Sequence, residues 1–226
     1  MAFLCASVSP RGAYFWLCCE DFKLKEFWNQ RYSGDEFFYG TDPNAFLASQ
    51  LHRFQPGQSV LAVADGEGRN GVWLARQGLD VTAVDFSPLA VEKEQRLAKQ
   101  HGVSVRHEIS DLFAWSWGEN RFDAIVAIFI QFVGPEQRRI LNGLMLRALK
   151  PGGLLILQGY RPRQLEYRTG GPSGVENLYT AETLREEFSA MEILHLAEHD
   201  DEICEGEGHC GMSALVDLVA RKCIPD

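Results

Sequence analysis

Apolar residues follow two alternating patterns along the chain from residue 59 onward. Short continuous apolar runs, typical of buried strands, are separated by stretches in which apolar residues recur at helical spacing. The strands are predicted at Ser59–Val63, Asp80–Val84, Val103–Glu108, Phe122–Phe129 and Leu154–Tyr160. The helices between them are predicted at Asn70–Gln77, Pro88–His101 and Pro135–Leu149. This alternation indicates an α/β fold, in which stacked β–α units surround a parallel sheet.

The pattern changes near both ends of this region. After residue 180 a helix is predicted at Ala181–Phe188, followed by two alternating strands at Glu192–Ala197 and Ala214–Arg221. The acidic, glycine-rich stretch from Asp200 to Gly211 is predicted to be a loop, so these strands form a hairpin that closes the sheet. Before the first strand, helices are predicted at Phe22–Tyr32 and Ala45–Phe54.

These elements favour one domain over residues 22–226, because no linker or repeat divides the chain. Residues 22–54 form an N-terminal helical lid in this interpretation, and residues 1–21 are expected to be a poorly structured extension. Arg11 lies between two short apolar patches rather than before them, which fits a secretory signal poorly. We therefore expect a cytoplasmic protein.

Charge and cysteine usage narrow the possible partners. The formal net charge is −9 and no basic tract is interleaved with aromatics, which argues against nucleic acid. No apolar run is long enough to cross a bilayer. The six cysteines lack C-x-x-C and zinc spacing, and the acidic stretch His199–Glu202 with His209 matches no metal-ligand pattern. We expect no metal, no membrane and a small molecule or inorganic ion as partner, in a monomer or homodimer.

A glycine-rich turn follows the first predicted strand and begins a helix. Gly66, Gly68 and Gly71 let the backbone approach a ligand closely, and the start of the helix offers unpaired N–H groups. Asp85 ends the second predicted strand, where a carboxylate accepts hydrogen bonds from both ribose hydroxyls of an adenosine. The turn also satisfies G-x-G-x-x-G, so an NAD-dependent oxidoreductase stays open as an alternative.

Several stretches, taken together, resemble class I S-adenosylmethionine-dependent methyltransferases close to the tellurite-resistance and thiopurine methyltransferase group. The similar stretches are Phe27–Tyr32, Tyr39–Asn44, Gly66–Asn70, Val84–Pro88 and Phe122–Ile125, with the turn Leu149–Gly153 before the fifth strand. The resemblance implies a Rossmann-like, doubly wound, seven-stranded sheet. This sheet would be mostly parallel with an antiparallel C-terminal strand, and helices would cover both faces. S-adenosylmethionine would bind across the carboxyl ends of strands one and four. No Tyr-x-x-x-Lys pair is present to support the oxidoreductase alternative.

The resemblance also implies roles for individual residues. Gly66 and Gly68 would face the methionine part of the cofactor, Asp85 the ribose, and Asp111 the adenine amino group. Arg31, in the lid, would pair with the cofactor carboxylate through two parallel hydrogen bonds. The remaining expected cofactor contacts are Trp28, Tyr39, Ala64, Asp65, Asn70, Phe86, Ser87, Ser110, Leu112, Ile128 and Phe129.

The chain departs from the family pattern after its first strand. Ala62 stands where many relatives have an acid, and Ala64 replaces the first glycine of the turn. We expect Ala64 to fit the turn with a φ below zero. We also hypothesise that Asp65 supplies the carboxylate that Ala62 lacks, facing the amino group of the cofactor.

The acceptor is less well specified by the sequence. The chain lacks the Asn/Asp-Pro-Pro-aromatic turn of enzymes that methylate nucleobases or glutamine amides, which favours a small molecule or an inorganic oxyanion. No catalytic residue is identified, and a catalytically silent cofactor-binding partner subunit stays open as a second alternative. Candidate acceptor contacts are Gln131, Tyr160, Arg161, Tyr167, Tyr179 and His209.

Overall fold

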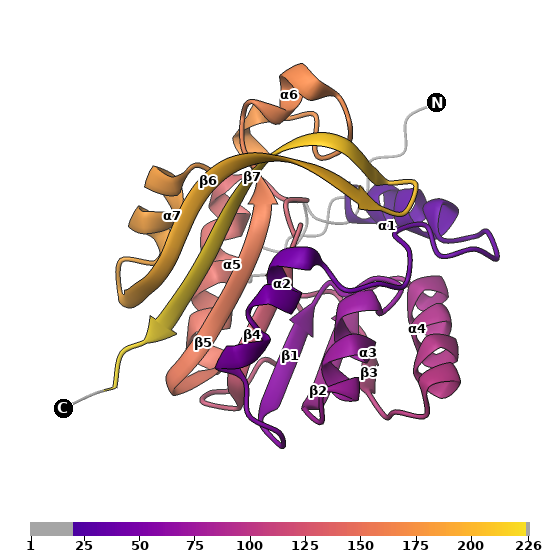
Figure 1. Cartoon of the computed structure of the whole chain (residues 1–226), viewed down its shortest axis with the longest axis horizontal. Coiled ribbons are helices and arrows are strands. Elements are labelled where there is room, and N and C mark those ends of the chain that lie inside the picture. Colours follow the sequence, from indigo (N-terminus) through magenta and orange to yellow (C-terminus); the bar gives the residue numbers. More distant parts are fainter. Residues whose placement is uncertain (1–19, 225–226) are drawn as a thin grey trace, which may run out of the picture.

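A seven-stranded sheet forms the centre of the protein, with strand order β3-β2-β1-β4-β5-β7-β6 (Figure 1). The computed structural model describes the backbone of residues 20–224 and the side chains from residue 25 onward, so most of the predicted N-terminal extension lies outside the described residues. The strands are β1 Ser59–Val63, β2 Asp80–Asp85, β3 Arg106–Ile109, β4 Phe122–Ile128, β5 Leu149–Tyr160, β6 Met191–Glu205 and β7 His209–Lys222. β1 to β5 run parallel and β7 runs antiparallel to its neighbours, which confirms the predicted fold class.

Helices bury both faces of this sheet. The helices are α1 Glu20–Arg31, α2 Ala45–Ser49, α3 Arg69–Arg76, α4 Pro88–His101, α5 Pro135–Ala148, α6 Gln164–Tyr167 and α7 Ala181–Glu187. α2, α3 and α4 pack on the face that carries Val60 and Ala62, while α5 and α7 pack on the face that carries Leu61 and Val63. Because successive residues of a strand point to opposite faces, both sets must be apolar, and this explains the continuous apolar runs of the central strands.

Local sequence explains where the main helices begin and end. Ser87 caps α4 by accepting a hydrogen bond from the backbone of Ala90 (3.3 Å), and Pro88 takes the first helical position. Gly102 ends α4 at a φ of +66°. The predicted helix Ala45–Phe54 is shorter in the structure, because α2 gives way after Ser49 to a 3₁₀ turn, η1 (Leu51–Arg53). A second 3₁₀ turn, η2 (Val175–Asn177), follows α6.

The loop predicted between the last two strands is wrong. β6 and β7 stay paired as far as Glu205 opposite His209, and only residues 206–208 form the turn. The acidic residues suggest a solvated loop because the sequence does not show which cations pair with them. In the structure Arg161 and Arg163, from another segment, both contact Asp200. Cys204 and Cys210, predicted to share a loop, instead face each other across the two strands with their sulfurs 3.5 Å apart.

The tip of this hairpin reaches over the sheet to the segment that follows α1 (Figure 1). The backbone N–H of Glu207 donates to the carbonyl of Phe38 (2.9 Å). Gly206 allows this docking, since a Cβ atom there would overlap the backbone of residues 38–40. Segments from the two ends of the chain therefore meet above the carboxyl ends of β1 and β4. No helix within residues 20–224 is both long and apolar enough to cross a membrane.

A buried ion pair joins α5 to α7 below the hairpin. Nε and Nη2 of Arg138 lie 2.9–3.1 Å from the carboxylate of Glu187, which also accepts from Asn142 (2.7 Å). Nη1 of Arg138 donates to the carbonyl of Glu176 in η2 (3.0 Å). The guanidinium therefore holds two helices and a turn in one arrangement.

We predict that Arg138→Met destabilises the protein by about 3–5 kcal/mol, because the carboxylate of Glu187 would remain buried without its cation. Urea denaturation followed by circular dichroism measures the change. Arg139→Met is the matched control, since the neighbouring Arg139 is exposed on the same helix and should shift the free energy of unfolding by less than about 0.5 kcal/mol. Equal effects of the two substitutions would contradict this account of the ion pair.

Candidate active site

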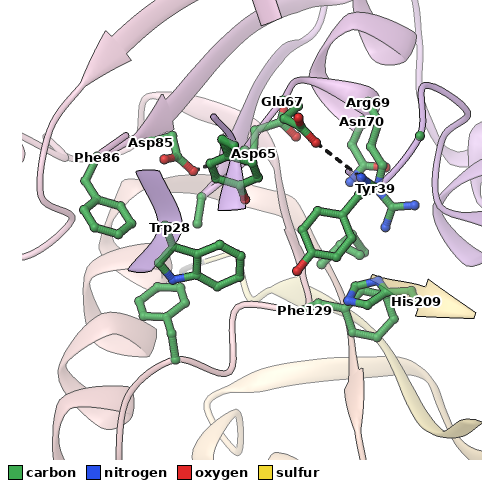
Figure 2. Close-up of a pocket in the computed structure, with 16 residues that line it drawn as sticks. Trp28, Tyr39, Asp65, Glu67, Arg69, Asn70, Asp85, Phe86, Phe129 and His209 are labelled. Carbon is green, nitrogen blue, oxygen red and sulfur yellow. Dashed lines mark hydrogen bonds between the residues drawn. The ribbon is translucent and has the colours of Figure 1, made fainter. Parts of the chain in front are cut away.

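A pocket lies at the carboxyl ends of β1, β2 and β4, below the lid and the hairpin tip (Figure 2). Its floor is the turn after β1, in which Ala64, Gly66 and Gly68 have φ values of +49°, +60° and +87°. A Cβ atom at Gly68 would overlap Glu94 of α4, so the glycine also permits close packing of α3 on α4. Three residues in left-handed backbone conformations therefore set the shape of the turn.

The expectation of a negative φ at Ala64 is wrong. Its φ of +49° is a left-handed conformation that glycine adopts at no steric cost, whereas an L-residue there costs about 1–2 kcal/mol. The surrounding contacts of the turn therefore hold Ala64 in a strained conformation.

Asp85, at the end of β2, fixes the turn from the side. Its carboxylate accepts from the backbone N–H groups of Gly66 (3.0 Å) and Ser87 (2.8 Å) and lines the pocket. Burial raises the pKa of Asp85 to about 6, and these backbone donors limit the rise. Each carboxylate oxygen keeps a second lone pair, so Asp85 still has acceptor capacity for ligand hydroxyl groups.

Glu67 and Arg69 connect the turn to the lid and to the hairpin. Glu67 forms a buried ion pair with Lys93 (2.6 Å). It also accepts from the backbone N–H of Tyr39 (3.2 Å), as Figure 2 shows. Nη2 of Arg69 donates to Glu205 of β6 (2.7 Å). Nη1 of Arg69 is buried in the pocket wall and has no hydrogen-bond partner among the described residues. An unpaired guanidinium nitrogen fits a ligand carboxylate such as that of S-adenosylmethionine.

The structure therefore places a cation that was not predicted, Arg69, in the pocket and the predicted one, Arg31, outside it. Arg31, expected to pair with the cofactor carboxylate, donates to the hydroxyl of Tyr39 (3.0 Å) and lies against the rings of Phe27 and Phe38 outside this pocket. Arg69 takes the position beside the turn. Sequence reasoning missed Arg69 although it directly follows Gly68, because a charged residue at the start of a helix is usually solvated.

Asp65 lines the pocket and also makes a contact that the sequence did not predict. Both of its carboxylate oxygens accept from the backbone N–H of Gly71 (2.9 and 3.2 Å), which caps α3 from within. Burial, then the nearby charge of Glu94, raises the pKa of Asp65 well above its usual value. This geometry gives the carboxylate a role in holding α3, and the hypothesised contact with the cofactor amino group stays a prediction.

A second space continues from this pocket past Phe86. It has a volume of about 220 Å³ and is lined by Ser110, Asp111 and Leu112, which the resemblance assigned to the adenine. Ala64, Asp85, Phe86 and Phe132 border both spaces. The combined site is polar near Arg69, which suits the amino-acid part of the cofactor. It is largely apolar beyond Phe86, which suits the base of the nucleoside.

A larger cavity of about 830 Å³ opens on the other side of the pocket, between the lid, the hairpin tip and the segment after β5. A third of the residues that line it carry aromatic rings: Phe27, Trp28, Phe38, Tyr39, Phe129, Phe132 and Tyr160. Phe129, directly after β4, has a φ of +56° and stacks on Tyr160, with ring centroids 4.7 Å apart. A strained residue at the junction of two cavities is typical of a functional site.

Most of the predicted site residues are brought together by the fold. The cofactor pocket and its extension contain Trp28, Tyr39, Ala64, Asp65, Gly66, Asn70, Asp85, Phe86, Ser110, Asp111, Leu112, Ile128 and Phe129. Gly68 and Ser87 lie behind the wall, where each supports a helix. Among the acceptor candidates, Gln131, Tyr160 and His209 line the large cavity.

The other acceptor candidates lie elsewhere. Arg161 and Tyr167 bind Asp200 on the outer side of the hairpin, and Tyr179 is buried in the core. Cavity residues that sequence reasoning missed come mainly from loops, whose position depends on tertiary contacts: Tyr32, Glu67, Arg69, Phe132, Arg168, Asn177 and Glu207.

Comparison with known proteins supports the predicted resemblance to S-adenosylmethionine-dependent methyltransferases. Residues 60–153 match the family model described as "Methyltransferase domain". These residues therefore form a methyltransferase domain of the S-adenosylmethionine-dependent kind. S-adenosylmethionine is the cofactor of this family, so the match decides against the oxidoreductase alternative.

Relatives and solved structures agree with this assignment of the methyltransferase domain. A thiopurine S-methyltransferase of Nitrosospira multiformis is 36% identical over 92 residues, covering 39% of this chain and 40% of the relative. A demethylmenaquinone methyltransferase of Renibacterium salmoninarum is 33% identical, covering 58% of this chain and 50% of the relative. The chain thus aligns with half or less of these relatives.

Among solved structures, the N-methyltransferase NodS of Bradyrhizobium japonicum in complex with S-adenosyl-L-homocysteine superposes with a TM-score of 0.66 at 17% identity, covering 88% of this chain and 97% of NodS. TehB of Haemophilus influenzae superposes with a TM-score of 0.65 at 17% identity, covering 88% of this chain and 66% of TehB. At this level of identity the superpositions support the fold of the methyltransferase domain.

We predict that Ala64→Gly leaves the stability of the methyltransferase domain unchanged or raises it by up to about 1 kcal/mol, because glycine relieves the left-handed strain. Thermal unfolding measures the change. Ala98→Gly, inside α4, is the control and should cost about 1 kcal/mol or more. A comparable loss in both variants would show that Ala64 carries no strain.

We also predict that the affinity for S-adenosylhomocysteine falls as the pH drops below about 6. The pKa of Asp85 is about 6, and a protonated carboxyl loses acceptor capacity for the ribose hydroxyls. Calorimetric titration between about pH 5 and 8 should show up to tenfold weaker binding per unit in the acidic range. Asp85→Asn should bind weakly at every pH, while Asp42→Asn, at an exposed carboxylate, should follow the unmodified protein. A flat profile in the unmodified protein would contradict the role of Asp85.

Proposed function

We propose that this protein transfers a methyl group from S-adenosylmethionine to a small organic molecule held in the aromatic cavity. The observation that carries the proposal is the shared wall between the two sites. Trp28, Tyr39, Phe129, Phe132 and His209 line both the cofactor pocket and the large cavity. A ligand in the cavity would therefore lie directly beside the part of the pocket assigned to the methionine end of the cofactor.

The composition of the cavity favours an organic acceptor with a ring over an inorganic oxyanion. Its aromatic side chains offer stacking surfaces. Arg161, a candidate acceptor contact, and its neighbour Arg163 are both paired with Asp200 outside the cavity. Arg31 and Arg168 do line the cavity, and they would suit a negatively polarised substituent on such a ring. Two of the relatives are named for activity on ring compounds, thiopurine and demethylmenaquinone, which agrees with this class.

The main task of the protein is to align the acceptor with the methyl group of the cofactor. The cofactor supplies a methyl group made electrophilic by its sulfonium. The protein residues must hold the acceptor in line with that group, exclude water and keep both ligands still. Such positioning contributes up to about 7–11 kcal/mol to lowering a barrier. The docked lid and hairpin tip supply the enclosure, since Phe38 and Glu207 join above the cavity.

The proposal is tested by measuring release of S-adenosylhomocysteine with a panel of aromatic thiols, phenols and amines, alongside tellurite, selenite and arsenite. Turnover of ring compounds that is abolished in Asp85→Asn is the expected result. Turnover of the oxyanions alone would assign the inorganic class instead. Cofactor binding without turnover of any acceptor would support a catalytically silent partner subunit and overturn the proposal.

We predict that Phe27→Ala raises the KM for an aromatic acceptor by about 2- to 10-fold, because a lost aromatic contact is worth about 0.5–1.5 kcal/mol. Phe27 lines the large cavity but not the cofactor pocket, so the affinity for S-adenosylhomocysteine should not change. Its ring is 49% exposed, so the substitution leaves no void in the core. Ile140→Ala, on the exposed side of α5, is the control and should alter neither quantity. An unchanged KM in Phe27→Ala would contradict aromatic binding in this cavity.

A further inference from the structure

His209 lies at the junction of the cofactor pocket and the large cavity and lines both (Figure 2). It is the first residue of β7, at the hairpin tip, and its ring is buried between Tyr39 and Phe129, with centroid distances of 4.5 and 4.4 Å. Tyr160 closes a third side at 5.7 Å. The imidazole therefore faces the place where acceptor and cofactor would meet, and three aromatic rings restrict its rotation.

One ring nitrogen of His209 is turned toward a carboxylate. Nδ1 lies 3.5 Å from Oε2 of Glu205, the residue directly opposite in the β6–β7 pairing, and has no hydrogen-bond partner at shorter range. A modest closure of the tip would convert this contact into a hydrogen bond, as catalytic contacts often tighten when ligands bind. With Nδ1 as the donor, Nε2 is left unprotonated as the acceptor.

Glu205 is itself firmly placed and ionised. Nη2 of Arg69 donates to it (2.7 Å), as does the side-chain amide of Asn44 (2.9 Å). The contacts with His209 and Arg69 lower the pKa of Glu205 to about 2 against the effect of burial. Glu205 thus places a fixed negative charge beside His209, whether the imidazole is neutral or protonated.

The groups around His209 favour its neutral form in the resting protein. Burial lowers the pKa of His209, and the positive charges of Arg69 and Arg31 act in the same direction, while Glu205 opposes them. Two ionisable rings in contact with the imidazole, Tyr39 and Tyr160, have pKa values raised by burial, so both stay uncharged near neutral pH. The imidazole is therefore ready to accept a proton near neutral pH.

We infer that His209 is the general base of the reaction, positioned by Glu205, and that the acceptor is an organic molecule whose nucleophilic atom carries a proton. The inference rests on the proposed function and narrows its substrate class. As the bond between the acceptor atom and the methyl carbon forms, the carbon–sulfur bond of the donor breaks and its electron pair returns to sulfur. The proton of the acceptor atom passes to Nε2 of His209, and the resulting imidazolium is stabilised by the carboxylate of Glu205.

The inference explains why an acidic residue and a histidine are buried together in an aromatic wall. A ring needed only for packing would be served by phenylalanine, without the cost of desolvating an imidazole and a carboxylate. A general base at His209 should matter for one type of acceptor and not for another, because an acceptor that is already ionised needs no base. His209 is then required for a phenol, which ionises near pH 10, and dispensable for an aromatic thiol that is ionised at about pH 8.

The test compares these two acceptors in one variant. In His209→Gln, kcat for the phenol should fall at least about 100-fold, whereas kcat for the ionised thiol should change less than about threefold. The thiol reaction shows that the variant is folded and binds the cofactor. His52→Gln, at an exposed histidine on η1, should leave both reactions unchanged. Equal losses for both acceptors, or no loss for the phenol, would overturn the role of His209 while leaving the proposed function in place.

Nuclear magnetic resonance titration of the His209 imidazole gives a readout that does not depend on turnover. The rate with the phenol should rise with pH through the pKa measured for His209. Glu205→Gln should lower that pKa, because the imidazolium loses its counter-charge, and should reduce kcat for the phenol more than for the thiol. An unchanged pKa in Glu205→Gln would contradict the positioning role of Glu205. If the unmodified protein methylates neither acceptor, the proposed function fails together with the inference.

Discussion

The site depends on the ionised carboxylate of Glu205, which joins three parts of the chain that are far apart in sequence. It binds Asn44 before α2, Arg69 at the start of α3 and His209 at the beginning of β7. A buried carboxylate deprived of its partners costs several kcal/mol, so Glu205 favours the observed positions of the lid, the glycine turn and the hairpin relative to one another. The two cavities therefore share a wall because one charge binds all three segments.

An element of this structure can be predicted from the sequence when local residues determine it, and not when a tertiary contact does. Central strands such as Val60–Val63 are buried on both faces, so their apolar runs are visible in the sequence. The outer part of the hairpin is different, because its acidic residues suggest a solvated loop until Arg161 and Arg163 are placed beside Asp200 in space. That pairing is a tertiary contact, and no local pattern contains it.

The same distinction applies to the site. Gly66 and Asp85 are predictable because a close backbone turn and a ribose each demand one residue type at a fixed place in the fold. Local sequence does not decide between Arg31 and Arg69 as the carboxylate partner, since both begin or end helices and the choice depends on where Glu205 lies. Ala64 gave the wrong sign of φ because the surrounding turn, rather than the intrinsic preference of alanine, sets the backbone there.

The segment that matches the family model and the segments that surround the acceptor are largely separate. Residues 60–153 supply the glycine turn and Asp85, whereas most walls of the large cavity come from residues 27–39, 160–177 and 207–210. Mutation in those outer segments can alter the acceptor without disturbing the machinery that holds the donor. The domain that binds the methyl donor is thus combined with cavity-lining segments that can vary in sequence. Mutant libraries for altering acceptor specificity are best confined to those outer segments.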